Sequence, residues 1–250
     1  MQVRNLIVGA LLFSCTGHVN AQSLTLRVDN IDQIVDSMTL EEKVNLLVGR
    51  NDYLFGGYEK LDKAPRVMDS SISGFTQVIP RLGIPATGLA DGPAGAVVVT
   101  RPDSKKNYYA TGFPIGSLLA CSWNTGLVET IGQAIGNEIL EYGVDVVLAP
   151  GMNIHRSPLC GRNYEYFSED PVLTGKIAAA YIRGVQSNGV GACPKHFAVN
   201  SQELRRMASD SVVDERTLRE LYLTGFEIVV KEAKPKTIMT SYNLINGTYA

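Results

Sequence analysis

Histidine and cysteine are scarce in this chain, which has three histidines and four cysteines among its 250 residues. Cys121, Cys160 and Cys193 lie dozens of residues apart, and that spacing fits neither a disulfide framework nor a zinc site. The sequence therefore favours no metal site and no bound cofactor. We expect these three cysteines to be small buried apolar residues.

The chain also lacks an excess of charge of either sign. Lys and Arg number 23 against 25 for Asp and Glu, which gives a formal net charge of -2 and excludes the electrostatic footprint of a nucleic-acid-binding protein. No Gly-x-Gly-x-x-Gly follows a predicted strand, so the phosphate loop of dinucleotide enzymes is missing. What is present is an apolar fraction of 45%, which excludes intrinsic disorder.

No apolar run reaches the ~20 residues that a membrane-spanning helix needs. The N-terminus instead combines Arg4 with a short apolar stretch from Leu6 to Phe13 and small residues up to Ala21, a pattern typical of a secretory signal. We predict a signal peptide over residues 1–21 and an exported domain over residues 22–250, in the periplasm or outside the cell. Lipid attachment at Cys15 is the less favoured alternative, because the bulky Phe13 lies close before it.

Strand-like and helix-like segments alternate after residue 80. The predicted strands are apolar and bounded by Gly, Pro or Asp, and they cover residues 83–90, 144–149, 190–198 and 237–242. Runs this apolar indicate strands buried on both faces, as in parallel sheets. Strands that alternate with helices predict an α/β fold with right-handed crossovers, here with about four strand–helix units. The polar segment from Asp52 to Arg81 is expected to be a surface loop.

The helices between these strands have recognisable ends. Thr39 and Glu42 have the spacing of a capping box. Asp170 is placed to cap a helix whose first residue is Pro171, and Gly189 follows its last turn. Two further helices are predicted from Leu127 to a terminating Gly143 and from Asp214 to Pro235.

Each predicted strand runs into a polar segment. Asp91 ends the first strand, and the later ones are followed by Asn153, His155, Arg156, Arg162, Asn163, Glu165, Glu169 and Asp170, then by Lys195, His196, Asn200, Glu203 and Arg206, and finally by Met239, Ser241, Tyr242 and Asn243. Sites of α/β enzymes lie beyond the carboxyl ends of strands. Carboxylates that accept hydrogen bonds, cations that donate them and a flat ring together suit an uncharged polyhydroxyl ligand.

A structural interpretation of the same residues is also open. Arg162 could pair with Glu165 or Glu169, and Glu203 could pair with Arg206, simply to hold their loops.

The polar segments resemble family 3 glycoside hydrolases of the β-glucosidase type. The run from Ala149 to Pro171, which includes Gly161-Arg162-Asn163-Tyr164-Glu165, is similar to the central signature of that family. Lys195-His196-Phe197, Asp214-Glu215-Arg216 and Met239-Thr240-Ser241-Tyr242-Asn243 resemble further blocks in the same order. The resemblance covers the chain from about Met38 to its last residue.

The resemblance implies a (β/α)8 TIM-like barrel, of which this chain is the N-terminal portion. It implies a retaining exo-β-glucosidase, which removes terminal non-reducing β-D-glucosyl residues from gluco-oligosaccharides or glucosides. The substrate-binding residues carried over from the family are Asp91, Arg162, Lys195, His196, Arg206, Met239 and Tyr242.

Retaining hydrolysis needs two carboxyl groups about 5 Å apart, and neither is found by resemblance. The nucleophile of the family lies in a Ser-Asp-Trp context, whereas the single tryptophan here, Trp123, lies in Ser-Trp-Asn. We therefore assign no catalytic residue and expect a fragment that binds sugar but is inactive alone.

Other functions remain open. An N-acetylhexosaminidase-like branch is disfavoured, because Lys195-His196-Phe197 continues into Ala198-Val199-Asn200 rather than into Pro-Gly-His. A β-xylosidase is a closer alternative, although Asp91 before Gly92-Pro93 resembles glucose-accepting members. A non-catalytic sugar-binding module is the alternative outside enzymes.

Overall fold

The computed structural model describes residues 24–49, 70–71, 73–100 and 107–250. The helices are α1 (Ile31–Ser37), α2 (Leu40–Val48), the 3-10 helix η1 (Pro80–Leu82), α4 (Gly116–Cys121), α5 (Thr125–Glu141), α6 (Pro171–Gln186), α7 (Glu215–Thr217), the π-helical η2 (Leu218–Leu223) and α8 (Thr224–Glu232). The strands are β1 (Ser70–Ser71), β2 (Gly74–Phe75), β3 (Gly88–Asp91), β4 (Val99–Thr100), β5 (Val146–Leu148), β6 (Gly191–Ala192), β7 (Lys195–Phe197), β8 (Asp210–Ser211), β9 (Met239–Thr240), β10 (Leu244–Ile245) and β11 (Thr248–Tyr249). The predicted signal peptide lies outside the described residues.

The main sheet has the order β2-β3-β5-β6, in which β3, β5 and β6 are parallel and β2 is antiparallel. Strand β7 follows β6 in the chain and pairs in parallel with β9. A bridge between Gly151 and Lys195 also connects the segment after β5 to β7. The predicted alternation of parallel strands and helices is thus confirmed, although the predicted strand 190–198 is divided into β6 and β7, which pair in different sheets. In the part of the chain that the structure describes, the strands form an open arrangement.

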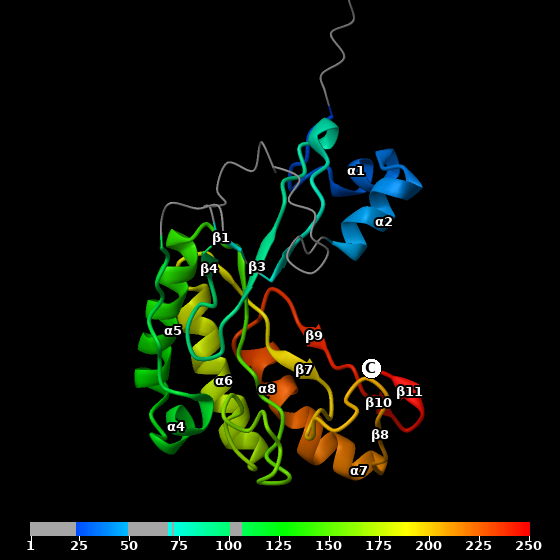
Figure 1. Ribbon diagram of the computed structural model, residues 1–250. Helices are drawn as coiled ribbons and strands as arrows, with labels where there is room; N and C mark the ends of the chain where they lie inside the picture. The colour runs from blue at the N-terminus through cyan, green and yellow to red at the C-terminus, as the bar shows by residue number, and fades with distance from the viewer. Residues whose placement is uncertain (1–23, 50–69, 72, 101–106) are drawn as a thin grey trace, which may run out of the picture.

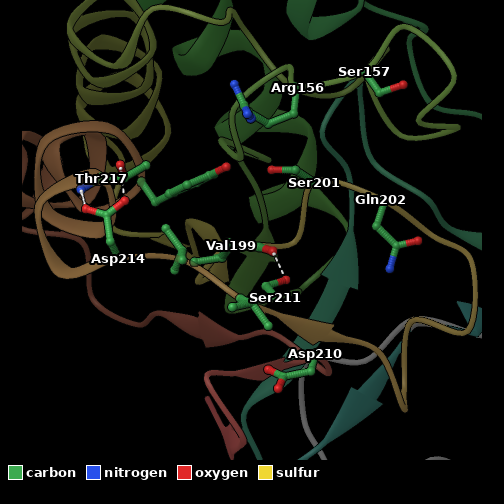
Figure 2. A pocket seen from close by; sticks show the side chains of 12 residues that line it. Arg156, Ser157, Val199, Ser201, Gln202, Asp210, Ser211, Asp214 and Thr217 are labelled. Atoms are coloured by element: carbon green, nitrogen blue, oxygen red, sulfur yellow. Dashed lines mark hydrogen bonds between the residues drawn. The ribbon is translucent and has the colours of Figure 1, made fainter.

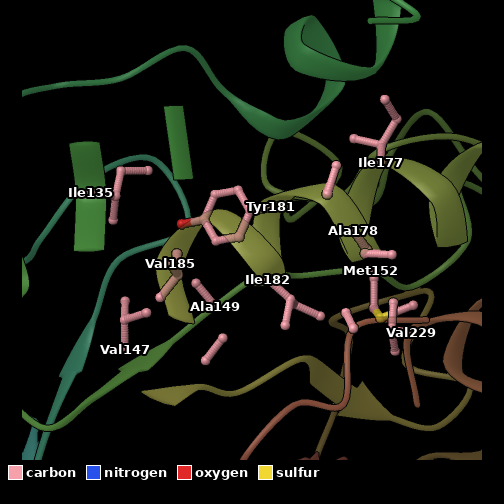
Figure 3. Close-up of a cluster of buried hydrophobic side chains, with 14 of the residues drawn as sticks. Ile135, Val147, Ala149, Met152, Ile177, Ala178, Tyr181, Ile182, Val185 and Val229 are labelled. Atoms are coloured by element: carbon pink, nitrogen blue, oxygen red, sulfur yellow. The ribbon is translucent and has the colours of Figure 1, made fainter. Parts of the chain in front are cut away.

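Helices α5, α6 and α8 lie side by side and pack on the strands (Figure 1). Their buried faces meet Val147, Ala149 and Ala192 of the sheet layer in one apolar core. Figure 3 shows Tyr181 and Val185 of α6 in this core, close to the strand residues. Among the residues described, none of the helices is both long and apolar enough to cross a membrane.

The helix ends follow the predicted caps. Thr39 and Glu42 form the capping box, and Asp170 Oδ1 accepts from the Leu173 amide at 2.7 Å with Pro171 as the first residue of α6. Asp214 caps α7 in the same way. Inside the helical run that follows, the sequence does not predict the π-helical turn η2, where the Thr224 hydroxyl donates to the carbonyls of residues 219 and 220.

Two expectations are wrong. Of the segment from 52 to 81, residues 70–71 and 73–81 are described, and they are no plain surface loop, because they contribute β1, β2 and the start of η1 and bury Phe75 and Ile79. Ile79 joins Ile34 and Met38 in a second small apolar cluster. Among the cysteines, Cys160 and Cys193 are buried as predicted, whereas Cys121 is exposed.

Candidate functional site

The candidate site is built from the end of β3, the segment after β5, and strands β7 and β9 with the loops that follow them. Asp91 is the last residue of β3, and Arg162 lies in the long segment after β5. Lys195 and Met239 are paired by register between β7 and β9. Parallel strand pairing and the Gly151–Lys195 bridge therefore bring together residues as distant in sequence as Asp91 and Met239.

Lys195 is the buried centre of this edge. Its side chain is 4% exposed and its Nζ lies 3.2 Å from Asp91 Oδ1 and 3.9 Å from Glu165 Oε2. Asp91 is 49% exposed, and its second carboxylate oxygen accepts from the Ser73 hydroxyl at 3.0 Å. Because a buried ammonium needs compensating charge, the two carboxylates stabilise Lys195 in place.

The network continues from Glu165 to the surface. Arg162 Nε donates to Glu165 Oε1 at 2.5 Å, and Arg162 also lies 3.9 Å from Glu203. Glu203 in turn lies 3.4 Å from Arg206. The six side chains thus alternate in sign, in the order Asp91, Lys195, Glu165, Arg162, Glu203, Arg206.

Tyr242 completes the cluster at its exposed end. The Arg206 guanidinium lies 5.1 Å from the centre of the Tyr242 ring, within the range of a cation–π contact. Tyr242 is 50% exposed, so one part of its ring remains free for a ligand. The structure therefore brings Asp91, Arg162, Lys195, Arg206 and Tyr242 into one connected group, and Met239 joins it through its backbone pairing.

His196 lies on the buried side of the group. Its backbone N–H donates to Asn153 Oδ1 at 2.8 Å, and Asn153 Nδ2 donates back to the His196 carbonyl at 2.9 Å. Burial, together with the smaller effect of the nearby cations Arg162, Lys195 and Arg206, lowers the pKa of His196 to about 2. The imidazole is therefore neutral under ordinary conditions.

The depressed pKa of His196 makes folding stability fall in acid. In the unfolded chain His196 takes up a proton near its ordinary pKa of 6.5, whereas in the folded chain it does so only near a pKa of about 2. As the pH falls from about 6.5 towards 2, the unfolded state binds more protons, and the free energy of unfolding drops by about 1.4 kcal/mol per pH unit. We expect urea unfolding of His196→Gln to lack this component, so that its stability relative to wild type rises as the solution is acidified. A gap between the two proteins that does not change with pH would contradict this.

Glu165, Glu203 and Ser73 contact the predicted substrate-binding residues but were not themselves predicted to bind substrate. The ion pairs that the structural interpretation allowed, Arg162 with Glu165 and Glu203 with Arg206, are both present in the structure. Their spacing of three residues was the available signal. Nothing in the sequence indicated Ser73, whose hydroxyl reaches Asp91 from a distant segment.

A separate pocket of about 500 Å³ is lined by none of the network residues (Figure 2). Arg156 and Ser157 from the segment after β5 face Ser201, Gln202 and a wall that contains Asp214. Of these residues, only Arg156 belongs to the polar strand ends singled out from the sequence.

Comparison with known proteins gives a consistent result. Residues 65–250 match the N terminal domain of glycosyl hydrolase family 3. The thermostable beta-glucosidase B of Acetivibrio thermocellus is 46% identical over 225 residues, which cover 88% of this chain and 27% of that protein. An exo-alpha-(1->6)-L-arabinopyranosidase of Bifidobacterium longum is 40% identical, with 86% of this chain and 26% of that protein covered.

A solved structure shares the fold. Beta-glucosidase 3B from Thermotoga neapolitana, in complex with glucose, superposes with a TM-score of 0.79 at 52% sequence identity, covering 87% of this chain and 30% of that one. The chain therefore spans about a quarter to a third of the length of these relatives.

Proposed function

Because the chain belongs to glycosyl hydrolase family 3, we propose that it supplies the sugar-binding part of the active site of an exo-β-glucosidase. The substrate class is a gluco-oligosaccharide or glucoside with a terminal, non-reducing β-D-glucosyl residue. The observation that carries this proposal is the convergence of Asp91, Lys195, Arg162 and Arg206 in one network that ends at Tyr242.

The chemistry of this network supports a sugar ligand. Asp91 is half-exposed and can accept hydrogen bonds from two hydroxyl groups, while Arg162 and Lys195 can donate to others. Tyr242 offers the face of a ring to the pyranose. Charge-assisted hydrogen bonds to neutral hydroxyls are strong and directional, so the network can orient a sugar at the scissile bond.

The carboxylates of the network are poorly suited to direct catalysis. Asp91 pairs with Lys195, Glu165 pairs with Arg162, and Glu203 pairs with Arg206. A nucleophile and a proton donor need carboxyl groups with opposed protonation states about 5 Å apart. We propose that hydrolysis proceeds with retention and that both catalytic carboxyl groups come from outside these 250 residues.

Hydrolysis of an aryl β-glucoside tests the proposed function. The protein expressed from its complete gene is expected to release the aryl group with retention of anomeric configuration, whereas the isolated 250 residues are expected to bind glucose without turnover. Glucose binding without hydrolysis by the complete gene product would instead favour a sugar-binding module. Turnover by the isolated 250 residues would refute the proposed origin of the carboxylates.

Asp91→Asn is expected to lower kcat/KM for the aryl glucoside about 100-fold, because charge-assisted hydrogen bonds to two hydroxyls are lost. Asp210→Asn is a matched control, since Asp210 also lies in a strand and accepts from the Gly247 amide, outside the network. It is expected to change kcat/KM by less than about threefold. Equal effects of the two changes would contradict a role for Asp91 in sugar binding.

Glucose is the proposed sugar, xylose is the alternative left open by the sequence, and arabinopyranose is an alternative that one relative makes relevant. A relative at 40% identity is an arabinopyranosidase, and these pentoses lack the hydroxymethyl group of glucose. Rates on the three aryl glycosides, measured at equal concentration, decide between them, and a dominant pentoside rate would overturn the choice of glucose.

Export is part of the proposal. It is supported by Arg4 and the apolar stretch from Leu6 to Phe13, residues that lie outside the described part of the chain. Sequencing the N-terminus of the mature protein is expected to find residue 22 first.

A further inference from the structure

Tyr166 is a buried residue that contacts the imidazole ring of His196. Tyr166 is completely buried, and its hydroxyl lies 3.2 Å from His196 Nδ1. The two rings meet edge to face. Burial raises the pKa of Tyr166, so its hydroxyl keeps its proton and has one hydrogen bond to donate.

The direction of this hydrogen bond follows from Asn200. Asn200 Nδ2 lies 3.2 Å from Glu203 Oε1 and 3.4 Å from the Tyr166 hydroxyl. A carboxylate only accepts, so the amide nitrogen of Asn200 must face Glu203. The same nitrogen then donates to the Tyr166 oxygen, and the Tyr166 proton remains for His196 Nδ1.

Asn153 is the competing partner of the imidazole. Its Oδ1 lies 3.3 Å from His196 Nδ1 but already accepts the His196 backbone N–H at 2.8 Å. If Nδ1 carried a proton for Asn153, the Tyr166 hydroxyl would be left without an acceptor in a fully buried position. Buried hydroxyl groups without partners are strongly disfavoured.

We propose that Tyr166 fixes the tautomer of His196, so that Nδ1 accepts and Nε2 carries the proton. Among the described residues no partner of His196 Nε2 is recorded, whereas both contacts of the ring use Nδ1. His196 is then a neutral donor, and its Nε2–H is directed to a ligand hydroxyl. This last step rests on the proposed sugar-binding function, and Tyr166 is a positioning residue that acts through His196.

Nitrogen-15 NMR of the imidazoles tests the tautomer in the complete gene product labelled at histidine. The His196 signal, assigned by its loss in His196→Gln, is expected to show a protonated Nε2 and an unprotonated Nδ1. In Tyr166→Phe, Asn153 Oδ1 is the remaining partner, so the proton is expected to move largely to Nδ1. His155 is an internal reference, because its Nε2 lies 3.0 Å from the Asn163 carbonyl, which only accepts. A protonated Nδ1 in the wild type, or an unchanged tautomer in Tyr166→Phe, would refute the proposal.

Tyr181→Phe is the matched control, because Tyr181 is also fully buried and its hydroxyl donates to a backbone carbonyl, that of Gly92. It should leave the His196 tautomer unchanged. On an aryl β-glucoside, Tyr166→Phe is expected to lower kcat/KM about tenfold relative to Tyr181→Phe. A loss of this size corresponds to the loss of one hydrogen bond to an uncharged ligand. A shifted tautomer in a gene product with no glycosidase activity would leave the role of Tyr166 intact and refute the proposed function. Equal kcat/KM in the two variants of an active enzyme would refute the donation from Nε2.

Discussion

Gly184→Ala is expected to destabilise the domain by about 3 kcal/mol, because the new methyl group has no space between α5 and α6. A Cβ at Gly184 would lie 2.1 Å from the carbonyl oxygen of Glu129 and 2.9 Å from Gly132 Cα. These neighbours are backbone atoms, which cannot rotate away as a side chain could. The two helices would therefore have to separate, and the higher helix propensity of alanine, about 1 kcal/mol, is too small to offset this.

Gly126→Ala is the control for this prediction. Gly126 lies in α5 as well, but a Cβ there would meet only Asn124 Oδ1, at 3.5 Å, which is an ordinary contact. Scanning calorimetry of the complete gene product is expected to show a midpoint roughly 6–12 °C lower for Gly184→Ala and no loss for Gly126→Ala. Matching midpoints for the two variants would mean that α5 and α6 do not pack this closely.

These glycine contacts illustrate what the sequence does not reveal. Gly132, Gly136 and Gly184 each interrupt a helical pattern, and by itself a glycine in a helix only weakens the prediction of that helix. Their meaning depends on the other helix, since a Cβ at Gly132 or Gly136 would meet a backbone carbonyl of α6 at 2.5 or 2.6 Å. The spacing of four residues places Gly132 and Gly136 on one face of α5, but it does not indicate which segment packs against that face.

Local features were predicted much better than distant contacts. The caps at Thr39, Asp170 and Asp214 are set by residues within four positions of one another, and all three form. The four central strands were found because they are apolar and bounded by turn residues. In contrast, Ile79 and Leu82 lie in a short turn around Pro80 with no helical or strand periodicity, and only contact with Ile34 and Met38 reveals why they are buried.

For the candidate site, the sequence likewise predicted which segments meet but not the individual contacts between them. The polar strand ends, together with the rule that parallel strands end at one edge, indicated which residues meet. The order of charges within the network was not predictable, because the contact between Lys195 and Asp91 joins positions 104 apart. The support of His196 by Tyr166 depends in the same way on side-chain orientation across 30 positions.

Glu165→Gln is expected to have the largest effect of any change within the network. Glu165 is 3% exposed, and its two oxygens face Arg162 at 2.5 Å and Lys195 at 3.9 Å. A neutral amide at this position would leave the charges of Lys195 and Arg162 without the carboxylate between them. Lys195 would keep only Asp91 as an ion-pair partner, and Arg162 would keep only Glu203. Removing one member of a buried ion pair is typically worth 3–5 kcal/mol, and we expect a loss of about 3 kcal/mol here.

Glu232→Gln is the control that distinguishes the effect of losing a buried ion pair from the effect of losing an exposed one. Glu232 also forms a 2.5 Å ion pair, with Lys176, but both side chains are substantially exposed. Exposed pairs are worth about 0–1 kcal/mol, so Glu232→Gln should hardly change the thermal midpoint, whereas Glu165→Gln should lower it by roughly 6–12 °C. Similar shifts in the two variants would show that Glu165 does not compensate the buried cations. The expected contrast ties the proposed site to the stability of the fold, because Glu165 both positions Lys195 and Arg162 at the proposed sugar site and compensates their buried charges.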